Sequence, residues 1–592
     1  MRKIFPILCI VCTILSSCAK NEMIPSDPDG NEESNALRTR SSADDSQGVG
    51  NPYSLSVMQA VYDNNSLETV VLEPTDLYVR FLPQDSTQLN YLLYESNLEL
   101  FDYPLDVDIS DDGIETAENN DGDYTWLYTT VKPDYAFPAG ISYEILDECY
   151  IPQEGERIVQ TRGDLPLDVE ELAYQSLGYA FDDDVPTRAS SVYPEGTIRV
   201  LQQDSTFVPV KGVKIRGHRF VKYSTTYTDV NGNYVLESKF RHRLHYAIVY
   251  NNIKGFDIWG NYAFFARANC NLGSHKKGGY SKDIEKDEDA WRWSVINNAA
   301  YDYYSMCEQT GITKPPRKLK IWCWSNAKSS SAPMLRRLEH GIGLNGNSGW
   351  VNFFANLGYG LLATSIQELV AFLSPDITIG TSGKSYKGIY EHVNHELAHA
   401  SHFSEVGSGY WAKYVSYIMT YGAYGDGTGN NAELCGIGEM WGDYIGVTRR
   451  YEGLGQSIPQ KYPDTNNYWF KPEVFWDLRN VNLDKNDIFS CLTRDVRTYD
   501  ALYSKMCDKF PSKVDSIKAC FTRYGLMSET EDPTDVTFED RTITTATTIT
   551  ADKITVRNVS VINGGGLKLV GNVEIYPSFL VEGGSSLEIK SH

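Results

Sequence analysis

Apolar and polar residues alternate in short segments over much of the first half of the chain. Residues 77–81 and 124–131 show this alternation, and acidic loops lie between them. Residues 196–201, 208–215 and 228–236 repeat it further on. Because successive side chains on a strand point to opposite faces, this period of two predicts strands with one buried face. Within the last segment, an Asn-Gly pair is typical of a tight hairpin turn.

The spacing changes near residue 270, where apolar residues begin to recur every three or four positions. This period is typical of amphipathic helices. We expect helices over residues 289–307, 390–403 and 433–449, with more around 497–524. Two short apolar segments of the same region, 318–324 and 376–380, predict strands.

The last part of the chain, from residue 535, returns to the alternating pattern. Gly566-Leu-Lys-Leu569 recurs twenty residues later as Ser586-Leu-Glu-Ile589, and glycines precede each copy. Two half-repeats at a fixed spacing predict a short stacked β module, either a fragment of a β-helix or a sandwich.

These changes of pattern predict a multidomain α+β protein. Its expected parts are a signal segment (1–18), a flexible tether (19–51), a mainly-β domain (52–181), a small β-sandwich (192–268), a mostly helical domain (269–530) and a C-terminal β module (535–592). In the sandwich, Pro209-Val-Lys-Gly-Val213 and Thr228-Asp-Val-Asn-Gly-Asn-Tyr234 resemble phrases of the transthyretin-like module found beside carboxypeptidases. The resemblance implies a fold but gives little information about function.

The N-terminus predicts export. Arg2 and Lys3 precede an apolar run over residues 4–15, which is too short to cross a bilayer and suits the core of a signal peptide. The run ends in Leu15-Ser-Ser-Cys18, which resembles the lipobox of bacterial lipoproteins. The resemblance implies cleavage before Cys18, acylation of that cysteine and a lipid anchor in the outer membrane, at the cell surface. The polar residues that follow would form the tether.

Charge and spacing argue against two classes of partner. The 592 residues include 54 Lys and Arg against 78 Asp and Glu, a formal net charge of −24, whereas nucleic-acid-binding proteins carry basic surfaces. Gly380-Thr-Ser-Gly-Lys-Ser385 lacks the glycine spacing of a phosphate-binding loop, so we expect no nucleotide. Eight cysteines follow the signal segment, which permits disulfides in an exported protein but does not fix their pairing.

The motif that points to chemistry is His395-Glu-Leu-Ala-His399. On a helix, residues four apart lie on one face with Cβ atoms about 5–6 Å apart, so two imidazoles can reach one tetrahedral zinc ion. Glu396 can take a proton from a zinc-bound water. We therefore predict Zn²⁺ as the cofactor, with His395 and His399 as ligands and Glu396 as the catalytic base. His392 and His402, on the same face, are interpreted as helix-surface or capping residues, with contact to the substrate or to a metal ligand as the alternative.

A third metal ligand is expected downstream. In Gly436-Ile-Gly-Glu-Met-Trp-Gly-Asp-Tyr-Ile-Gly446, Glu439 and Asp443 are again four residues apart. Together with the first motif, this segment resembles the gluzincin metallopeptidases, the thermolysin-like group. The resemblance implies that Glu439 is the third zinc ligand. It also implies that Asp443 accepts a hydrogen bond from the outer nitrogen of a ligand histidine, most simply His395.

Two alternative ligands remain open, because 39 residues separate the second histidine from Glu439, about twice the usual length in that group. Metzincins place their third ligand six residues after the second histidine, where this chain has Glu405. Glu433 is the other alternative.

The chain also lacks a histidine that the thermolysin-like group uses to stabilise the tetrahedral intermediate. After His402 the only histidine is His592. Tyr421 and Tyr424, in a glycine-rich loop between the two motifs, are candidates for an oxyanion-stabilising role.

Two functions of different classes follow. The first is a zinc-dependent metallopeptidase that cleaves a protein or peptide substrate outside a Gram-negative cell. The second is a non-catalytic surface lipoprotein on a zincin scaffold, either an adhesin or a glycan- or protein-binding protein, which the missing histidine and the β modules would suit. Retention of Glu396 favours the enzyme, because a structural zinc site has no use for this carboxylate.

Overall fold

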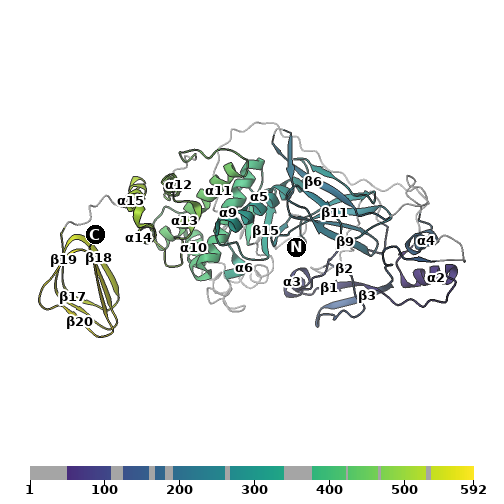
Figure 1. Ribbon diagram of the computed structural model, residues 1–592, viewed down its shortest axis with the longest axis horizontal. Helices are drawn as coiled ribbons and strands as arrows, with labels where there is room; N and C mark the ends of the chain where they lie inside the picture. The colour runs from purple at the N-terminus through teal and green to yellow at the C-terminus, as the bar shows by residue number, and fades with distance from the viewer. Residues whose placement is uncertain are drawn as a thin grey trace. The chain divides into compact units, whose positions relative to one another are not determined.

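The computed structural model combines helices and mixed sheets in several parts, consistent with a multidomain α+β chain (Figure 1). By internal packing, the chain separates into a unit up to Lys509 and a second unit from Phe510 onward. Cys18, the signal segment and the tether up to residue 49 lie outside the described residues. None of the described helices is both long and apolar enough to cross a bilayer. The structure describes residues 50–108, 125–158, 167–179, 191–203, 205–260, 267–338, 376–421, 424–463, 468–527 and 535–591.

The N-terminal part of the first unit is a small antiparallel sheet with short helices. Its elements are α2 (Leu55–Asn65), β1 (Asp76–Leu82), α3 (Ser86–Tyr94), β2 (Leu127–Val131), β3 (Ser142–Cys149), β4 (Arg157–Ile158), β5 (Leu167–Asp168) and α4 (Val169–Ser176). The sheet has the order β2-β1-β3. Tyr78 of β1 packs in a core that includes Phe220, whereas Val79 packs in another that includes Trp259 and Trp322. The N-terminal sheet is therefore built onto later strands on both of its faces.

Two further sheets follow. Their strands are β6 (Glu195–Gln203), β7 (Thr206–Pro209), β8 (Val213–Arg219), β9 (Lys222–Tyr227), β10 (Asn233–Val235), β11 (Leu244–Asn252), β12 (Phe256–Trp259), β13 (Asn269–His275), β14 (Lys282–Ile284), β15 (Leu319–Trp324) and β16 (Ile377–Gly380). One sheet has the order β10-β6-β14, with β7 paired to β6. The other has the order β16-β15-β12-β11-β8-β9, with β13 paired to β11.

These sheets cross the boundary expected at residues 268–269. β13 and β14 lie beyond it in sequence, yet they pair with β11 and β6. β15 pairs in parallel with β12, and β16 in parallel with β15, so both extend the larger sheet. Parallel neighbours need a crossover connection, commonly a helix, and α5 (Asp289–Thr310) lies in the connection between β12 and β15. The segments 192–268 and 269–530 therefore share hydrogen-bonded sheets.

The Asn231-Gly232 turn is present, but it does not make the expected hairpin. The Gly232 N–H donates to the Asp229 carbonyl oxygen at 3.1 Å, and Gly232 has a φ of +77°. The strands on either side, β9 and β10, belong to different sheets, because Asn233 of β10 pairs with Thr197 of β6. The turn was readable from local sequence, whereas the partner of β10 is set by a segment more than thirty residues away.

The remaining helices of the first unit include α9 (Tyr386–Val406) and α11 (Ala432–Glu452), which pack against each other. They also include α6 (Leu335–Leu338), α10 (Ser408–Tyr421), α12 (Glu473–Asn480), α13 (Lys485–Phe489) and α14 (Tyr499–Lys509). The helices expected over 390–403 and 433–449 fall within α9 and α11. The Tyr303 hydroxyl of α5 donates to Ser401 Oγ of α9 at 2.9 Å, so α9 is held between two helices.

The second unit contains η2 (Pro511–Lys513), α15 (Val514–Arg523) and the strands β17 (Asp535–Ile543), β18 (Ala546–Val561), β19 (Gly566–Ile575), β20 (Leu580–Val581) and β21 (Ser586–Lys590). Each of its strand pairs is parallel. Leu567 pairs with Leu587, and Leu569 with Ile589, so the two copies of the repeat stack in register.

Candidate metal centre

The first half of the centre comes from α9. Its first turn is capped by Ser385, whose Oγ accepts a hydrogen bond from the Gly388 N–H at 3.3 Å. Three turns further on, His395 and His399 are both buried, and their Nε2 atoms lie 3.0 Å apart. Two imidazole nitrogens that converge in a buried space favour a shared proton or a bound cation between them.

The second half comes from α11, which brings two carboxylates to the same place. Glu439 is fully buried, and its two oxygens lie 3.6 Å from His395 Nε2 and 3.6 Å from His399 Nε2. Asp443, one turn later, places Oδ1 at 3.1 Å from His395 Nδ1, the ring nitrogen that faces away from Glu439. A carboxylate in this position fixes the imidazole tautomer so that Nε2 is free to bind a metal.

Glycines on α11 allow the two helices to come this close. A Cβ atom at Gly442 would lie 2.9 Å from His395 Cε1 and 2.9 Å from His399 Nε2. A Cβ atom at Gly446 would lie 3.1 Å from the Cβ of His395, and one at Gly438 would meet the Tyr414 ring at 2.9 Å. The glycines at every fourth position therefore form the face of α11 that turns toward the histidines.

Three potential ligand atoms lie close enough together to share one metal ion. They belong to His395, His399 and Glu439, and all lie within 4.8 Å of one another. A tetrahedral zinc ion with bonds of about 2.0–2.2 Å separates its ligand atoms by about 3.4 Å. The two Nε2 atoms are 3.0 Å apart, and each lies 3.6 Å from a different oxygen of Glu439, so the donors surround a space of the size that such an ion occupies.

Glu396 lies beside this group in an unusual electrostatic position. It is fully buried, and within the described part of the chain neither carboxylate oxygen has a hydrogen-bond partner. Burial raises its pKa above that of an ordinary glutamate, and the nearby Glu439 adds to the increase. Burial alone would lower the pKa of His395, but its interactions with Asp443 and Glu439 outweigh burial and raise it. A cation in the centre would offset the cost of these buried carboxylates.

Sequence reasoning missed one residue of the centre, Tyr414. Its hydroxyl donates to Glu439 Oε1, and its ring lies 5.6 Å from the His399 ring. Trp411 stacks on Tyr414 at 4.4 Å and also contacts His399. Both come from α10, whose aromatic residues recur at helical spacing. That spacing indicates a packed helix face, but it does not indicate that the face meets the metal ligands.

The structure also describes the surroundings of Tyr421 and Tyr424, the two candidates for an oxyanion-stabilising role. Tyr421, at the end of α10, is 45 % exposed, and its ring packs on Tyr417. Tyr424 is buried, with Tyr468 and Phe470 against its ring at 5.0 Å each.

The structure also places the alternative ligands. Glu405 is exposed, and its Oε2 accepts a hydrogen bond from the Thr313 hydroxyl at 2.6 Å. Glu433 accepts a hydrogen bond from the Tyr499 N–H at 2.6 Å, which ties α14 to the start of α11. Neither belongs to the group that converges with the histidines. The interpretation of His402 as a surface or capping residue is wrong, because its side chain is buried against Tyr410 and Trp411.

The cysteines add no cross-link to this region. All eight that follow the signal segment lie among the described residues, and all eight are free thiols. The disulfides that their even number permits are therefore absent from the structure.

No known family model matches the chain, and no curated protein matches it. What the centre can do chemically follows from its own atoms. Two imidazole nitrogens and a carboxylate converge in a buried space, with a second buried carboxylate beside them. This buried His-His-Glu group could bind a metal ion.

Proposed function

We propose that the chain is a zinc-dependent metallopeptidase of the gluzincin type, which hydrolyses peptide bonds in a protein or peptide substrate. The observation that carries the proposal is the convergence of His395, His399 and Glu439, whose ligand atoms lie within 4.8 Å of one another, with Glu396 buried beside them. A purely structural metal site would gain nothing from this additional carboxylate, which is costly to bury without a hydrogen bond.

The donor set favours zinc over other metals. Two imidazole nitrogens and one carboxylate oxygen form a ligand set common to catalytic zinc sites, in which a fourth position remains open for water or substrate. Magnesium and calcium prefer sites made of oxygen atoms alone. When bound, zinc would polarise the scissile carbonyl and lower the pKa of a bound water to about 7.

The protein groups would then divide the work. His395, His399 and Glu439 hold the metal. Asp443 orients His395 through Nδ1, and the Tyr414 hydroxyl orients Glu439. Glu396 accepts a proton from the attacking water and passes it to the nitrogen of the leaving amine, which requires a carboxylate that is ionised when water binds.

The location of this activity is part of the proposal. The signal-like N-terminus and Cys18 support export and a lipid anchor in the outer membrane, which would place the metal centre outside the cell. The segment that resembles a transthyretin-like module would then be an accessory domain, although its strands share their sheets with strands of the metal-binding segment.

The decisive experiment separates metal binding from turnover. Wild-type protein and the Glu396→Gln variant are compared for zinc content and for cleavage of a quenched fluorescent peptide library. We expect about one zinc ion per chain in both proteins. Loss of a general base typically lowers the rate about 10²- to 10⁴-fold, so cleavage by the variant should fall by that factor. Glu439→Ala should lose the zinc as well as the activity.

Glu405→Gln is the matched control, because Glu405 is an exposed glutamate on the same helix. It should retain both zinc and cleavage. A wild-type protein that binds zinc but cleaves no member of the library would instead favour the non-catalytic surface lipoprotein. A wild-type protein that binds no zinc would contradict both readings of the centre.

A further inference from the structure

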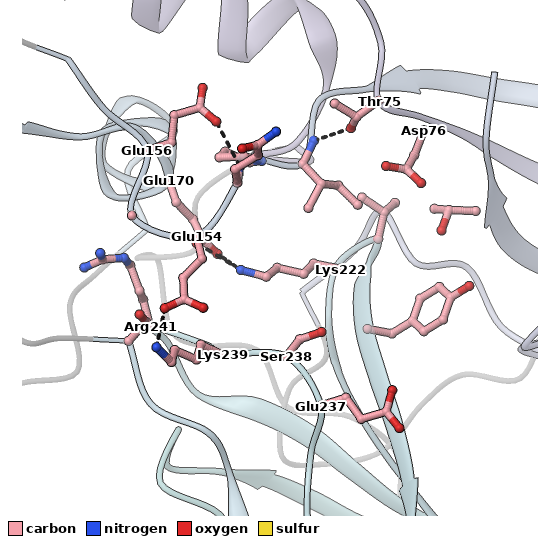
Figure 2. Close-up of a pocket in the computed structure, with 18 of the residues that line it drawn as sticks. Thr75, Asp76, Glu154, Glu156, Glu170, Lys222, Glu237, Ser238, Lys239 and Arg241 are labelled. Atoms are coloured by element: carbon pink, nitrogen blue, oxygen red, sulfur yellow. Dashed lines mark hydrogen bonds and ion pairs between the residues drawn. The ribbon is translucent and has the colours of Figure 1, made fainter.

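A cleft of about 570 Å³ lies in the first unit, and none of the residues of the metal centre lines it. One side is formed by the N-terminal sheet and by residues 151–156, and the other by β9 and residues 237–241 (Figure 2). Its volume falls within the range of about 300–1,000 Å³ typical of sites for small ligands. We refer to it as the charged cleft.

The cleft is lined by charged side chains that are largely paired with one another. Lys222 Nζ lies 3.0 Å from both carboxylate oxygens of Glu170, and both side chains are nearly buried. Arg241 lies 2.5 Å from Asp168. Two more pairs, which are more exposed, are Lys132 with Asp76 and Lys239 with Glu154.

Tyrosine hydroxyls hold two of the carboxylates in place. Tyr53 donates to Glu170 Oε1, the same oxygen that accepts from Lys222. Tyr62 and Tyr150 both donate to Glu156 Oε1, at 2.6 Å for Tyr150. Side chains that are fixed in this way lose little further freedom when a ligand binds, so the cleft is organised in advance.

The composition of the walls excludes two classes of ligand. Six carboxylates and four cationic groups line the cleft, a net charge of −2, so an anion would be repelled. Among the twenty lining residues the aliphatic side chains are those of Ile151, Pro152 and Val221, so an apolar ligand would leave many polar groups without partners.

A cation would have to compete for most of the carboxylates, because four of the six already pair with a cationic group and Glu156 accepts from two tyrosines. Lys222, Lys239, Arg241 and Lys132 each pair with an acidic residue of the wall. What the pairs still offer is hydrogen bonding, since an ammonium group has three donors and a carboxylate about four acceptor sites. A hydroxyl group both donates and accepts, so it can bridge the two members of such a pair.

We propose that the charged cleft binds a neutral, polyhydroxylated ligand of the oligosaccharide class. Alternating ammonium and carboxylate groups provide partners for successive hydroxyls, and Tyr223 adds an aromatic side chain to the wall. This site gives the N-terminal segment and β9 a shared function that is separate from the metal centre. A surface enzyme with such a site would be held at glycans or glycosylated proteins while the metal centre acts.

The proposal is tested by binding of the full chain to an array of neutral glycans, followed by calorimetric titration of the best binder. The variant is the double substitution Glu154→Ala with Lys239→Ala, which removes a partly exposed pair at the cleft without leaving a buried charge behind. We expect binding to weaken about tenfold, since about 1.4 kcal/mol corresponds to a factor of ten. Ser238→Trp, which adds bulk to the cleft without changing its charge, should weaken binding at least as much.

The matched control removes an ion pair of similar exposure outside the cleft, through Lys553→Ala with Glu574→Ala. It should bind within about twofold of wild type. Spermidine and a heparin tetrasaccharide serve as cationic and anionic probes, and neither should bind at the cleft. The proposal is overturned if no neutral glycan on the array binds, if both cleft variants bind as tightly as wild type, or if only a charged probe depends on the cleft.

The outcome is independent of the proposed peptidase activity. No residue of the His395–His399–Glu439 group lines the cleft, so treatment with a chelator should leave glycan binding unchanged. A protein that binds glycan but cleaves nothing would disprove the activity alone, and a protein that cleaves peptides but binds no glycan would disprove the cleft alone.

Discussion

Asp443 acts on the proposed zinc site through one atom of His395. The 3.1 Å contact with Nδ1 keeps the proton on that nitrogen and leaves Nε2 to bind the metal. Replacing Asp443 by Asn keeps the shape but removes the charge. Loss of such an outer partner typically costs about 10- to 100-fold in metal affinity, so Asp443→Asn should weaken zinc binding by that factor in a competition assay with a chromogenic chelator.

Asp500→Asn is the control for this substitution, because Asp500 is an exposed residue on α14. It should leave zinc affinity unchanged. Equal affinities for Asp443→Asn and wild type would show that His395 is oriented by its packing alone.

His242 should make the protein less stable in acid. Only 11 % of its side chain is exposed, and its ring stacks on Tyr174 at 4.0 Å. Burial, aided by the positive charge of Arg219, lowers its pKa to about 3, although the carboxylates of Glu170 and Glu171 are also near.

The sign of the effect follows from the two pKa values. In the unfolded chain the histidine has a pKa of about 6.5, so it is protonated below that pH. In the folded state the same side chain stays neutral until about pH 3. Stability is therefore lost as the pH falls from about 6.5, by about 2 kcal/mol at pH 5.

His242→Gln should reduce this loss. Urea unfolding of wild type and variant at pH 7 and pH 5 measures it, and titration between pH 7 and pH 8, where neither protein should change, is the control. The same loss of stability in both proteins would show that His242 is free to protonate in the folded state.

At the scale of elements, the glycine face of α11 decides whether the centre can form. A methyl group at Gly442 would collide with the rings of His395 and His399. Overpacking of this kind typically costs about 1–3 kcal/mol, and about 1.4 kcal/mol corresponds to a factor of ten. Gly442→Ala should therefore weaken zinc binding about tenfold or more, even though alanine is the better helix former. Zinc stoichiometry and helix content by circular dichroism measure the two effects separately.

Gly388→Ala on α9 is the matched control, since a Cβ atom there would find only ordinary contacts at 3.7 and 3.8 Å. It should bind zinc normally and should be slightly more stable, by up to about 1 kcal/mol. If Gly442→Ala also binds zinc normally, α11 and α9 can move apart without loss of the centre.

The same elements show how far sequence reasoning reached. α9 and α11 were readable because each carries its chemistry at a spacing of four on a single helix, and the helical period fixes which side chains share a face. Which faces meet is a tertiary property. Tyr414 could not be found because α10 lies against Glu439 only in the folded chain.

At the scale of the whole molecule, domain boundaries were harder to infer than elements. Changes in the hydrophobic pattern separate strand-like from helix-like stretches of sequence. A single sheet can nevertheless take strands from both sides of such a change. β13 and β14 begin after residue 268, where the hydrophobic pattern becomes helix-like. They still pair with β11 and β6, which lie before that residue. The boundary that packing supports lies instead between Lys509 and Phe510.

This boundary predicts that the second unit can be removed without harm to the metal centre. A chain that ends at Lys509 retains α14, whose Tyr499 N–H holds Glu433 at the start of α11. We expect it to bind about one zinc ion and to unfold within about 2 °C of the full chain, because a packed unit loses little when a separate one is deleted.

A chain that ends at residue 498 lacks this contact and the buried Leu502 and Met506, so its zinc content and melting temperature should both fall. Zinc content and differential scanning calorimetry decide the matter: if the chain ending at Lys509 behaves like the shorter one, the second unit contributes to the stability of the first.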